Sequence, residues 1–502
     1  MNNLLKRNLL YKNKEKDNYL QELDNKKLTL RKEKLTNNIM KRRFENLDYQ
    51  FGYFLELSQI KYIEKYKDVE FKSIDDIFNF IENKLNDRDI NNIYLGLYFL
   101  KNIKIFSKEN LTKFINSNLN KIFLQLIENN KENKIIINEI IIFLIEITYN
   151  DNFHLTNKIY SKNDYLSMYN LLFNIYVNNE IICNNLLMLL GNIVVYDNSA
   201  QTNFYKSNLI DFIIKINIDT DNIKIKEKSF WAITCFILDI QSNEFFKDKE
   251  EFFFKIIDDI IFKIYTNEIY LENLLICISA ISDINNNNIL KKFFDNKFIS
   301  FILNLDRKYY YYSNIFFLNI FSYNTETNEF FIKTFTNFYL FILNGLNSNL
   351  TKIQSDCIMS LTNLIDNSKY NIHYLINHKI INKIIELCLK DLASPFLSLN
   401  LIEFLNSLLQ ESDDDIKFIL YKLNIINAYI KFLSNNYNDE ITLIILNGVC
   451  YFLENDSENK TFKREFMNLN GVEYLEKIMN NLYIKKSSDK ACFILDKFFI
   501  DK

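Results

Sequence analysis

The chain has 502 residues, of which 48% are hydrophobic, with one Pro, six Gly and a net charge of −3. This length exceeds what one compact core holds, so we expect several domains or one elongated repeat array. The scarcity of Pro and Gly argues against an all-β fold with many tight turns. It predicts helices, with the abundant Asn residues supplying helix caps and turns.

Charge is divided unevenly along the chain. Residues 1–44 hold 13 Lys and Arg against 5 Asp and Glu, a net of +8, whereas the remainder holds 47 against 58, a net of −11. A basic arm on an acidic body predicts an acidic partner for the arm and a basic partner for the body, with the arm itself as one candidate. The acidic body argues against nucleic acid as the main ligand.

Residues 45–74 fit no repeat, and we interpret them as a tether between the arm and an array that follows. The N-terminus contains no apolar stretch of signal-peptide length. The most apolar run, residues 135–147, is interrupted by Asn138, Glu139 and Glu146. We therefore expect buried helices and no membrane insertion.

From about residue 75 to residue 502 the pattern repeats as an apolar helix, a polar turn rich in Asn or Asp, and a second apolar helix. Segments 186–216 and 357–389 show it clearly. Equivalent positions recur at a nearly constant interval, at 146, 192, 235, 280, 319, 363, 406 and 451. This is the period of armadillo and HEAT repeats. Such units bury their apolar faces only by stacking, which predicts an all-α solenoid with a long concave surface.

Catalytic and metal-binding patterns are missing from the sequence. The seven Cys form no CxxC pair and only three His are present, so we expect buried, reduced thiols rather than a zinc or disulfide framework. No GxSxG, phosphate loop or HExxH occurs. We predict no catalytic residues, no metal and no cofactor; an enzyme built on the array is the poorer alternative.

Three N-terminal segments follow one another in a recognisable order: YKNKEKD (11–17), LTLRKEK (28–34) and MKRRF (40–44). They resemble the importin-beta-binding segment of the importin-alpha (karyopherin alpha) family, and residues 468–499 resemble that family's closing repeat. The chain departs from the family at YLQELDNKK (19–27), where the family has a run of arginines. This departure puts the affinity for importin-beta in doubt.

The resemblance implies a right-handed superhelical solenoid of about ten armadillo repeats and the role of a nuclear import adaptor. The implied partners are importin-beta, proteins carrying basic nuclear localisation signals, and the family's export receptor, with shuttling between cytoplasm and nucleus. By position, the importin-beta-binding residues are Lys12, Lys14, Lys16, Arg31, Lys32 and Lys34. Lys41, Arg42 and Arg43 match the autoinhibitory cluster, for which the alternative is a solvated helix end.

In this family the groove-lining helices repeat a Trp and, four residues later, an Asn, which places both on one helical face. The Asn amide carries a donor and an acceptor for the backbone of an extended peptide. The indoles hold the stems of Lys or Arg side chains and attract their charge, and acidic residues meet the charged heads. Such a groove selects short runs of basic residues.

In the N-terminal half, the positions that match the Trp/Asn pairs are Ile142/Glu146, Met188/Asn192 and Trp231/Cys235. Trp231 is the only Trp in the chain, and it is either a groove residue or a core residue. Glu146 is either a groove acid or an exposed turn residue. Cys235 does not replace the hydrogen bonds of an amide.

In the C-terminal half, the matching pairs are Ile315/Asn319, Met359/Asn363 and Ile402/Asn406, with Asp356 three residues before Met359. We expect these Asn residues to bind a peptide backbone, although chance placement in an Asn-rich chain is the alternative. The run Asp413–Asp415 is expected to form a solvated turn and a helix start. Because the Trp/Asn pattern is incomplete, the alternative function is an armadillo interaction scaffold that has lost its import role.

Overall fold

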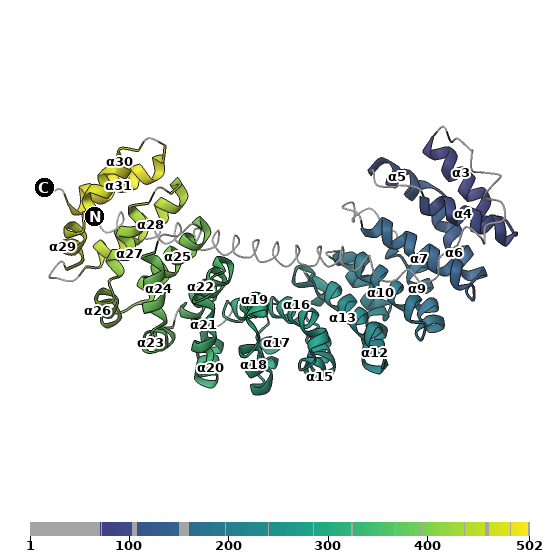
Figure 1. Cartoon of the computed structure of the whole chain (residues 1–502), viewed down its shortest axis with the longest axis horizontal. Helices are drawn as coiled ribbons and strands as arrows, with labels where there is room; N and C mark the ends of the chain where they lie inside the picture. Colours follow the sequence, from purple (N-terminus) through teal and green to yellow (C-terminus); the bar gives the residue numbers. More distant parts are fainter. Residues whose placement is uncertain are drawn as a thin grey trace, which may run out of the picture. The chain divides into compact units, whose positions relative to one another are not determined.

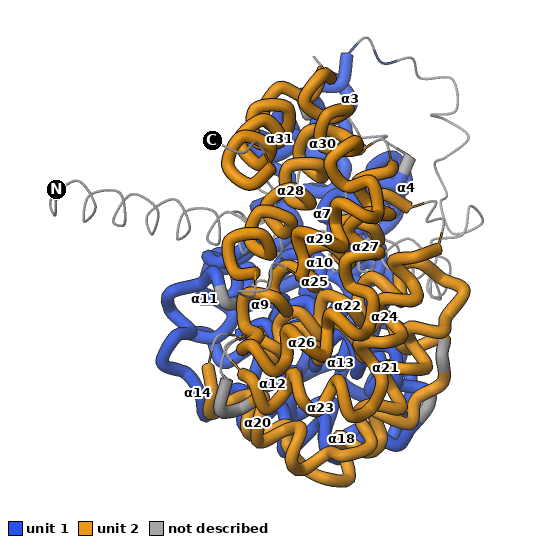
Figure 2. The backbone as a smooth tube through the Cα atoms, turned by 90° about the vertical axis from the view of Figure 1, so that its left-hand side faces the viewer, with its two compact units in different colours: residues 1–284 blue, residues 285–502 orange. Residues whose placement is uncertain are grey.

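The computed structural model describes most of residues 71–499. Its gaps lie at 72, 103–107, 150–159, 196, 239, 285, 323–324, 367, 391–393, 436, 457–460 and 482. The predicted arm lies outside the described residues, and with it Lys12, Lys14, Lys16, Arg31, Lys32, Lys34, Lys41, Arg42 and Arg43. The chain divides into two compact units, residues 1–284 and 285–502, which Figure 2 colours separately.

The first unit is built from helices in all of its described parts (Figure 1). They are α3 (Ile74–Leu85), α4 (Ile90–Asn102), α5 (Lys108–Asn116), α6 (Leu119–Asn129), α7 (Lys134–Tyr149), α9 (Asn163–Tyr176), α10 (Glu180–Val194), α11 (Asn198–Lys206), α12 (Leu209–Asp219), α13 (Ile223–Ile237), α14 (Glu250–Ile256), α15 (Phe262–Ile264) and α16 (Leu271–Ser282). A π-helical turn, Ile257–Ile261, joins α14 to α15.

The described residues of the second unit are also helical. The helices are α17 (Asn287–Lys292), α18 (Asn296–Leu303), α19 (Tyr310–Ile320), α20 (Thr325–Thr334), α21 (Phe338–Leu346), α22 (Thr351–Ile365), α23 (Lys369–Asn377), α24 (Ile380–Cys388), α25 (Pro395–Glu411), α26 (Asp414–Lys422), α27 (Ile425–Leu433), α28 (Asp439–Glu454), α29 (Thr461–Asn468), α30 (Gly471–Met479) and α31 (Lys485–Phe498). The described chain contains no strand, which confirms the predicted all-α class.

A repeat of three helices accounts for this order. Two short helices precede each of the longer helices α7, α13, α22, α25, α28 and α31; α5 and α6, for example, have 9 and 11 residues, and α7 has 16 residues. We call the third helices, together with the corresponding α4, α10, α16 and α19, the ladder helices. Three helices in each repeat, recurring at the period found in the sequence, identify an armadillo-type solenoid.

Within each unit the ladder helices pack on one another in succession. In the first unit α10 contacts α7 and α13, and in the second unit α25 contacts α22 and α28. Such a helix buries apolar residues on several faces; in α10 every residue from Ile182 to Val194 is buried. A single repeat lacks these neighbours, so the fold depends on stacking.

The sequence pattern predicts a polar turn between two apolar helices of a repeat. The structure has a short helix at that place. Residues 198–206, NSAQTNFYK, form α11. This helix begins at the cap Asp197, whose side chain accepts a hydrogen bond from the backbone N–H of Ala200 at 2.9 Å. Its sequence is short and polar, so its hydrophobic periodicity is too weak to predict a helix.

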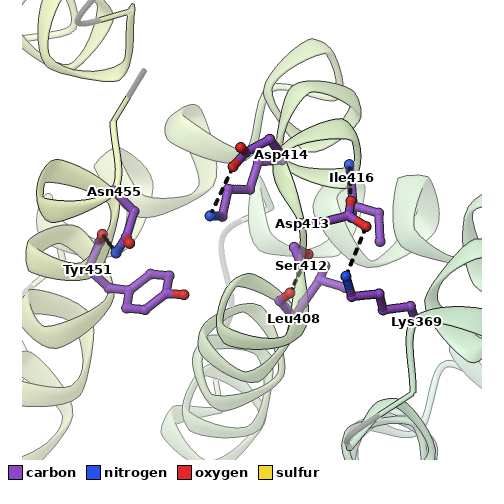
Figure 3. Close-up of polar contacts among 9 residues, drawn as sticks. Lys369, Leu408, Ser412, Asp413, Asp414, Ile416, Tyr451 and Asn455 are labelled. Atoms are coloured by element: carbon purple, nitrogen blue, oxygen red, sulfur yellow. Dashed lines mark hydrogen bonds and ion pairs between the residues drawn. The ribbon is translucent and has the colours of Figure 1, made fainter. Parts of the chain in front are cut away.

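Helix capping follows the expected use of small polar residues. Asn179, Asn222 and Asn438 cap α10, α13 and α28 by accepting hydrogen bonds from backbone N–H groups of the first turn. Asp413 caps α26 in the same way, with Ile416 N at 3.0 Å, and pairs with Lys369 Nζ at 3.2 Å (Figure 3). The predicted helix start at Asp413–Asp415 is thus confirmed.

Four junctions between the two short helices of a repeat use left-handed backbone. The residues immediately before α12, α27 and α30 are Asn208, Asn424 and Asn470, with φ of 58°, 64° and 61°. Lys379 occupies the same place before α24 with φ of 58°. Asn tolerates this conformation better than Lys does, so Lys379 carries backbone strain that its counterparts avoid.

Replacing Lys379 by Asn is therefore expected to stabilise the repeat of α23 and α24 by about 0.5–1 kcal/mol. Amide hydrogen exchange in these two helices measures the local change, since a repeat array need not unfold in one step. Lys383→Asn, inside α24, is the matched control and is expected to destabilise through helix propensity. Faster exchange in Lys379→Asn than in the unmodified protein would contradict this account.

Candidate functional site

The predicted groove residues lie on ladder helices, and the members of each matching pair are four residues apart. In the first unit the pairs are Ile142/Glu146 on α7, Met188/Asn192 on α10 and Trp231/Cys235 on α13; in the second they are Ile315/Asn319 on α19, Met359/Asn363 on α22 and Ile402/Asn406 on α25. Each set of three therefore lies on successive helices of one unit. We call the helical face that carries these positions the ladder face.

In the first unit the ladder face is mostly buried. Met188, Asn192 and Trp231 are 7%, 0% and 4% exposed. The ring of Trp231 lies against Gly191 of α10, where an added Cβ would overlap the indole. Lys228 Nζ lies 5.4 Å from the centroid of the same ring. Trp231 thus packs α13 on α10, and its assignment as a groove residue stays a prediction.

Glu146 is the half-exposed member of this set. Burial raises the pKa of its carboxyl, Lys101 opposes that rise, and the nearby Glu139 adds to it. Lys101 Nζ also lies 3.8 Å from Glu139 Oε1, and Glu139 is buried. The start of the ladder face in this unit therefore combines two carboxyl groups with one ammonium group.

In the second unit some of the predicted groove residues are buried and others are half-exposed. Asn319, Asp356 and Met359 are buried. Asn363 is half-exposed, and its Nδ2 donates to the backbone carbonyl of Leu318 on α19 at 3.0 Å. This bond uses one of the two amide N–H groups and ties α22 to its neighbour.

Asn406 is half-exposed, but both of its amide atoms are bonded within the protein. Its Oδ1 accepts from the hydroxyl of Tyr429 on α27 at 2.5 Å, and its Nδ2 donates to the carbonyl of Ile444 on α28 at 3.0 Å. Gly448 on α28 leaves room for this arrangement, because a Cβ there would overlap both Asn406 and Tyr429. The amide of Asn406 is therefore directed into the packing between repeats.

A stripe of accessible side chains runs along the ladder face of α25 and α28. On α25 its members are Leu399, Glu403, Asn406, Ser407 and Gln410; on α28 they are Leu443, Asn447, Tyr451 and Glu454, all half-exposed or exposed. Successive members within a helix are mainly three or four residues apart, which places them on one face. We call this set the α25–α28 stripe. It is the accessible continuation of the predicted groove.

Sequence reasoning missed the α28 members of the stripe. Asn447 and Tyr451 stand one repeat beyond Ile402 and Asn406, at the same spacing of four residues. The period alone locates them. They were missed because the amide and the aromatic ring occupy the pair in the reverse order, with Asn first and Tyr second. A search for an aromatic residue followed by Asn passes over this helix.

Comparison with family models and with curated proteins finds no match. Among solved structures, an engineered protein from the Northeast Structural Genomics Consortium aligns with a TM-score of 0.63 and 11% identity over 84% of this chain and 99% of its own. A protein designed for modular peptide recognition and a designed armadillo repeat protein in complex with the peptide (KR)4 each give a TM-score of 0.39, with 14% and 15% identity, over 45% and 46% of this chain and 94% and 96% of theirs. The similarity to the engineered protein supports the fold alone. The two TM-scores of 0.39 are too low to support a conclusion about this chain.

Other kinds of site receive no support from the described residues. No group of three or more His, Cys, Asp or Glu within that part of the chain is arranged to hold a metal ion. None of the helices described is both long and apolar enough to cross a membrane. None of the seven cysteines forms a disulfide, and six of them are buried. Burial raises the pKa of Cys183 and of Cys277 to about 12. These two thiols are poor nucleophiles at neutral pH.

Because Trp231 is the only Trp, its fluorescence reports on the packing between α10 and α13. Gly191→Ala is expected to displace the ring, to destabilise the first unit by about 1–3 kcal/mol and to shift the emission to longer wavelength. Gly345→Ala, which places a Cβ against Cys357 in the second unit, is the matched control and should leave the native emission unchanged. An unchanged emission and stability in Gly191→Ala would show that the described packing is wrong.

Proposed function

We propose that this protein is a nuclear import adaptor whose armadillo array binds extended segments rich in Lys and Arg. The observation that carries the peptide-binding part of the proposal is the α25–α28 stripe with Asn363 beside it. There, amide and carboxylate side chains on successive ladder helices are accessible along one face. Repeated polar groups at the spacing of stacked helices suit an extended chain better than a compact ligand.

Charge supports a basic ligand. The chain beyond residue 44 has a net charge of −11, and Glu403, Glu411 and Glu454 lie on or beside the stripe. Lys497 Nζ pairs with Glu454 Oε1 at 2.6 Å and neutralises one of these acids. As a group, the carboxylates of this face favour cationic side chains and disfavour phosphate groups.

The import role itself rests on the N-terminal arm. Its segments 11–17, 28–34 and 40–44 resemble the importin-beta-binding segment in order. On this proposal Lys12, Lys14, Lys16, Arg31, Lys32 and Lys34 bind importin-beta. Lys41, Arg42 and Arg43 compete for the groove until importin-beta withdraws the arm, because tethering gives them a high effective concentration. The export receptor and shuttling between cytoplasm and nucleus belong to the same proposal.

A second candidate function is an armadillo interaction scaffold without an import role. The burial of Met188, Asn192 and Trp231 favours it, because those positions match the Trp/Asn pairs that line the groove in the resembled family. On this reading the ladder face of the first unit serves packing. The two candidates differ in whether the arm binds importin-beta and in whether a basic peptide binds at all.

Titration of the full chain with a fluorescein-labelled octapeptide of alternating Lys and Arg tests the peptide-binding part. Lys41→Ala/Arg42→Ala/Arg43→Ala is expected to tighten binding, since it removes the tethered competitor. In that background Asn363→Ala is expected to weaken binding about two- to tenfold, as the loss of one hydrogen bond does. Asn377→Ala, an exposed amide on α23, is the control. No binding, at low salt and in either background, would contradict the proposal.

Pull-down with importin-beta tests the import part. Arg31→Ala/Lys32→Ala/Lys34→Ala in the full chain is expected to reduce capture at least about tenfold, because several charge-assisted hydrogen bonds are lost together. Substitution of Lys485 and Lys486 at the start of α31 removes the same kind of charge outside the arm and serves as the control. Equal capture of both variants and of the unmodified chain would favour the scaffold.

A further inference from the structure

The first described repeat consists of α3, its second short helix, and α4, its ladder helix (Figure 1). In the next repeat the first short helix, α5, contacts both α6 of its own repeat and α3 of the preceding one. Within the described part of the chain no helix precedes α3. The place that α5 has in its repeat therefore belongs, in the first described repeat, to the chain before residue 71.

Three aromatic rings meet where that chain reaches α3 and α4. The ring of Phe71, the first described residue, lies 5.4 Å from that of Phe80 on α3 and 5.8 Å from that of Phe99 on α4, measured between centroids. Phe80 and Phe99 are 5.1 Å apart. All three pairs are edge-to-face, which is a favourable geometry, and all three residues are half-exposed.

The next repeat contains a similar triad in buried form. The ring of Phe114 on α5 lies 6.2 Å from that of Phe123 on α6 and 5.3 Å from that of Phe143 on α7. These three residues are buried. Each triad takes one ring from the second short helix, one from the ladder helix and one from the chain before them. Phe71 therefore has the role of Phe114, and the chain that leads to Phe71 has the place of α5.

Phe80 and Phe99 lie on the sides of α3 and α4 that are turned away from the following repeat. The ring of Phe78 lies 6.1 Å from a ring of α5, and Phe80, two residues later, is about 200° further round α3. Lys101 pairs with a carboxylate of α7 at 3.8 Å, and Phe99, two residues earlier, is about 200° away round α4. Farther along this unit a preceding repeat packs on that side, as α7 does on α10.

The sequence before residue 71 has the spacing of a further first short helix. α6 begins 45 residues after α3, and α7 begins 44 residues after α4. At this interval the counterpart of α5 is the segment 63–71, IEKYKDVEF. Tyr66 and Val69 of that segment match positions 111 and 114, which are buried in α5. Its apolar residues thus recur where α5 makes its packing contacts.

A counterpart of the ladder helix α4 lies earlier still, at residues 46–58, NLDYQFGYFLELS. Gly52 matches Gly96 of α4, in a chain with only six Gly. The missing side chain at Gly96 leaves room for Leu85 of α3. Of the 25 residues from 46 to 70, 12 are hydrophobic, which is the share found in the whole chain, 48%. This composition differs from that of a flexible linker, which is rich in Gly, Ser, Pro or charge.

We propose that residues 46–70 are a cap of the array rather than a tether, and that they pack on the side of α3 and α4 that carries Phe80 and Phe99. Residues 46–58 take the place of a preceding ladder helix, and residues 63–70 take that of the first short helix. The end of a solenoid needs such a terminal unit to cover its apolar face. This inference goes beyond the proposed function and does not depend on it. It joins the basic arm directly to the end of the array, whatever the arm binds.

Hydrogen–deuterium exchange of the full chain, followed by mass spectrometry, tests the cap. Residues 46–58 and 63–70 are expected to exchange at least about tenfold more slowly than residues 1–44, because packed helices protect their amides. The measurement is made at several protein concentrations, with light scattering to give the mass. Protection that is independent of concentration is expected, because the segment packs within its own chain.

A double substitution tests whether the segment packs on α3 and α4. Leu57 matches Lys101, which faces the following repeat, and Phe54 lies one turn earlier on the same side. Phe54→Asp/Leu57→Asp therefore places two carboxylates against α4. It is expected to raise exchange in residues 46–70, α3 and α4 about tenfold or more, since burying unpaired charge is costly, and to leave α30 and α31 unchanged.

Two further variants address general effects of substitution. Leu20→Asp/Leu23→Asp makes a matched change at the same spacing inside the arm and is expected to leave exchange in α3 and α4 unchanged. Phe99→Ala removes one ring of the first triad and leaves the segment itself intact. It is expected to raise exchange in residues 46–70 about threefold or more, because the segment loses part of its packing surface.

Three outcomes would overturn the inference. The first is exchange of residues 46–70 as fast as that of residues 1–44. The second is unchanged exchange in α3 and α4 of the Phe54→Asp/Leu57→Asp variant. The third is protection that appears only at higher protein concentration together with a doubled mass, which assigns this face to a second copy of the chain.

Discussion

Packing of each ladder helix between the ladder helices of neighbouring repeats is the interaction on which the rest of the structure depends. It buries nearly all of α10 and the C-terminal part of α13, and it uses polar bonds as well as apolar contact. Asn185 Nδ2 donates to Asn138 Oδ1 across α10 and α7 at 2.8 Å, and Asn400 on α25 donates to Ser355 on α22. These bonds satisfy buried amides and fix the register of neighbouring helices.

The same packing decides which side chains a ligand can reach. Where a ladder residue packs against a neighbouring repeat, as Trp231 packs against Gly191 of the preceding one, the face is structural. Where the ladder face is accessible, as it is on α25 and α28, amides, carboxylates and a tyrosine ring are exposed or half-exposed. The proposed peptide-binding function therefore depends on the places where stacking leaves polar groups accessible.

The period and class of the fold follow from the sequence because apolar ladder helices recur at a nearly constant interval, and stacking demands that recurrence. The short helices are harder to predict: α11 is polar, and a cap at Asp197 rather than periodicity sets its start. The site is predicted only to the level of helix and face. Whether Asn406 points outward depends on Tyr429 of α27 and Gly448 of α28, whose contacts the spacing within α25 does not reveal.

The central claim is that basic segments bind to the ladder face of the second unit. Photo-crosslinking of the full chain with a Lys/Arg octapeptide that carries a benzophenone side chain, followed by mass spectrometry, tests it most directly. The account predicts that the adducts fall on α22, α25 and α28, and that unlabelled peptide competes for them. Adducts confined to α7, α10 and α13, or spread over the short outer helices, would contradict it.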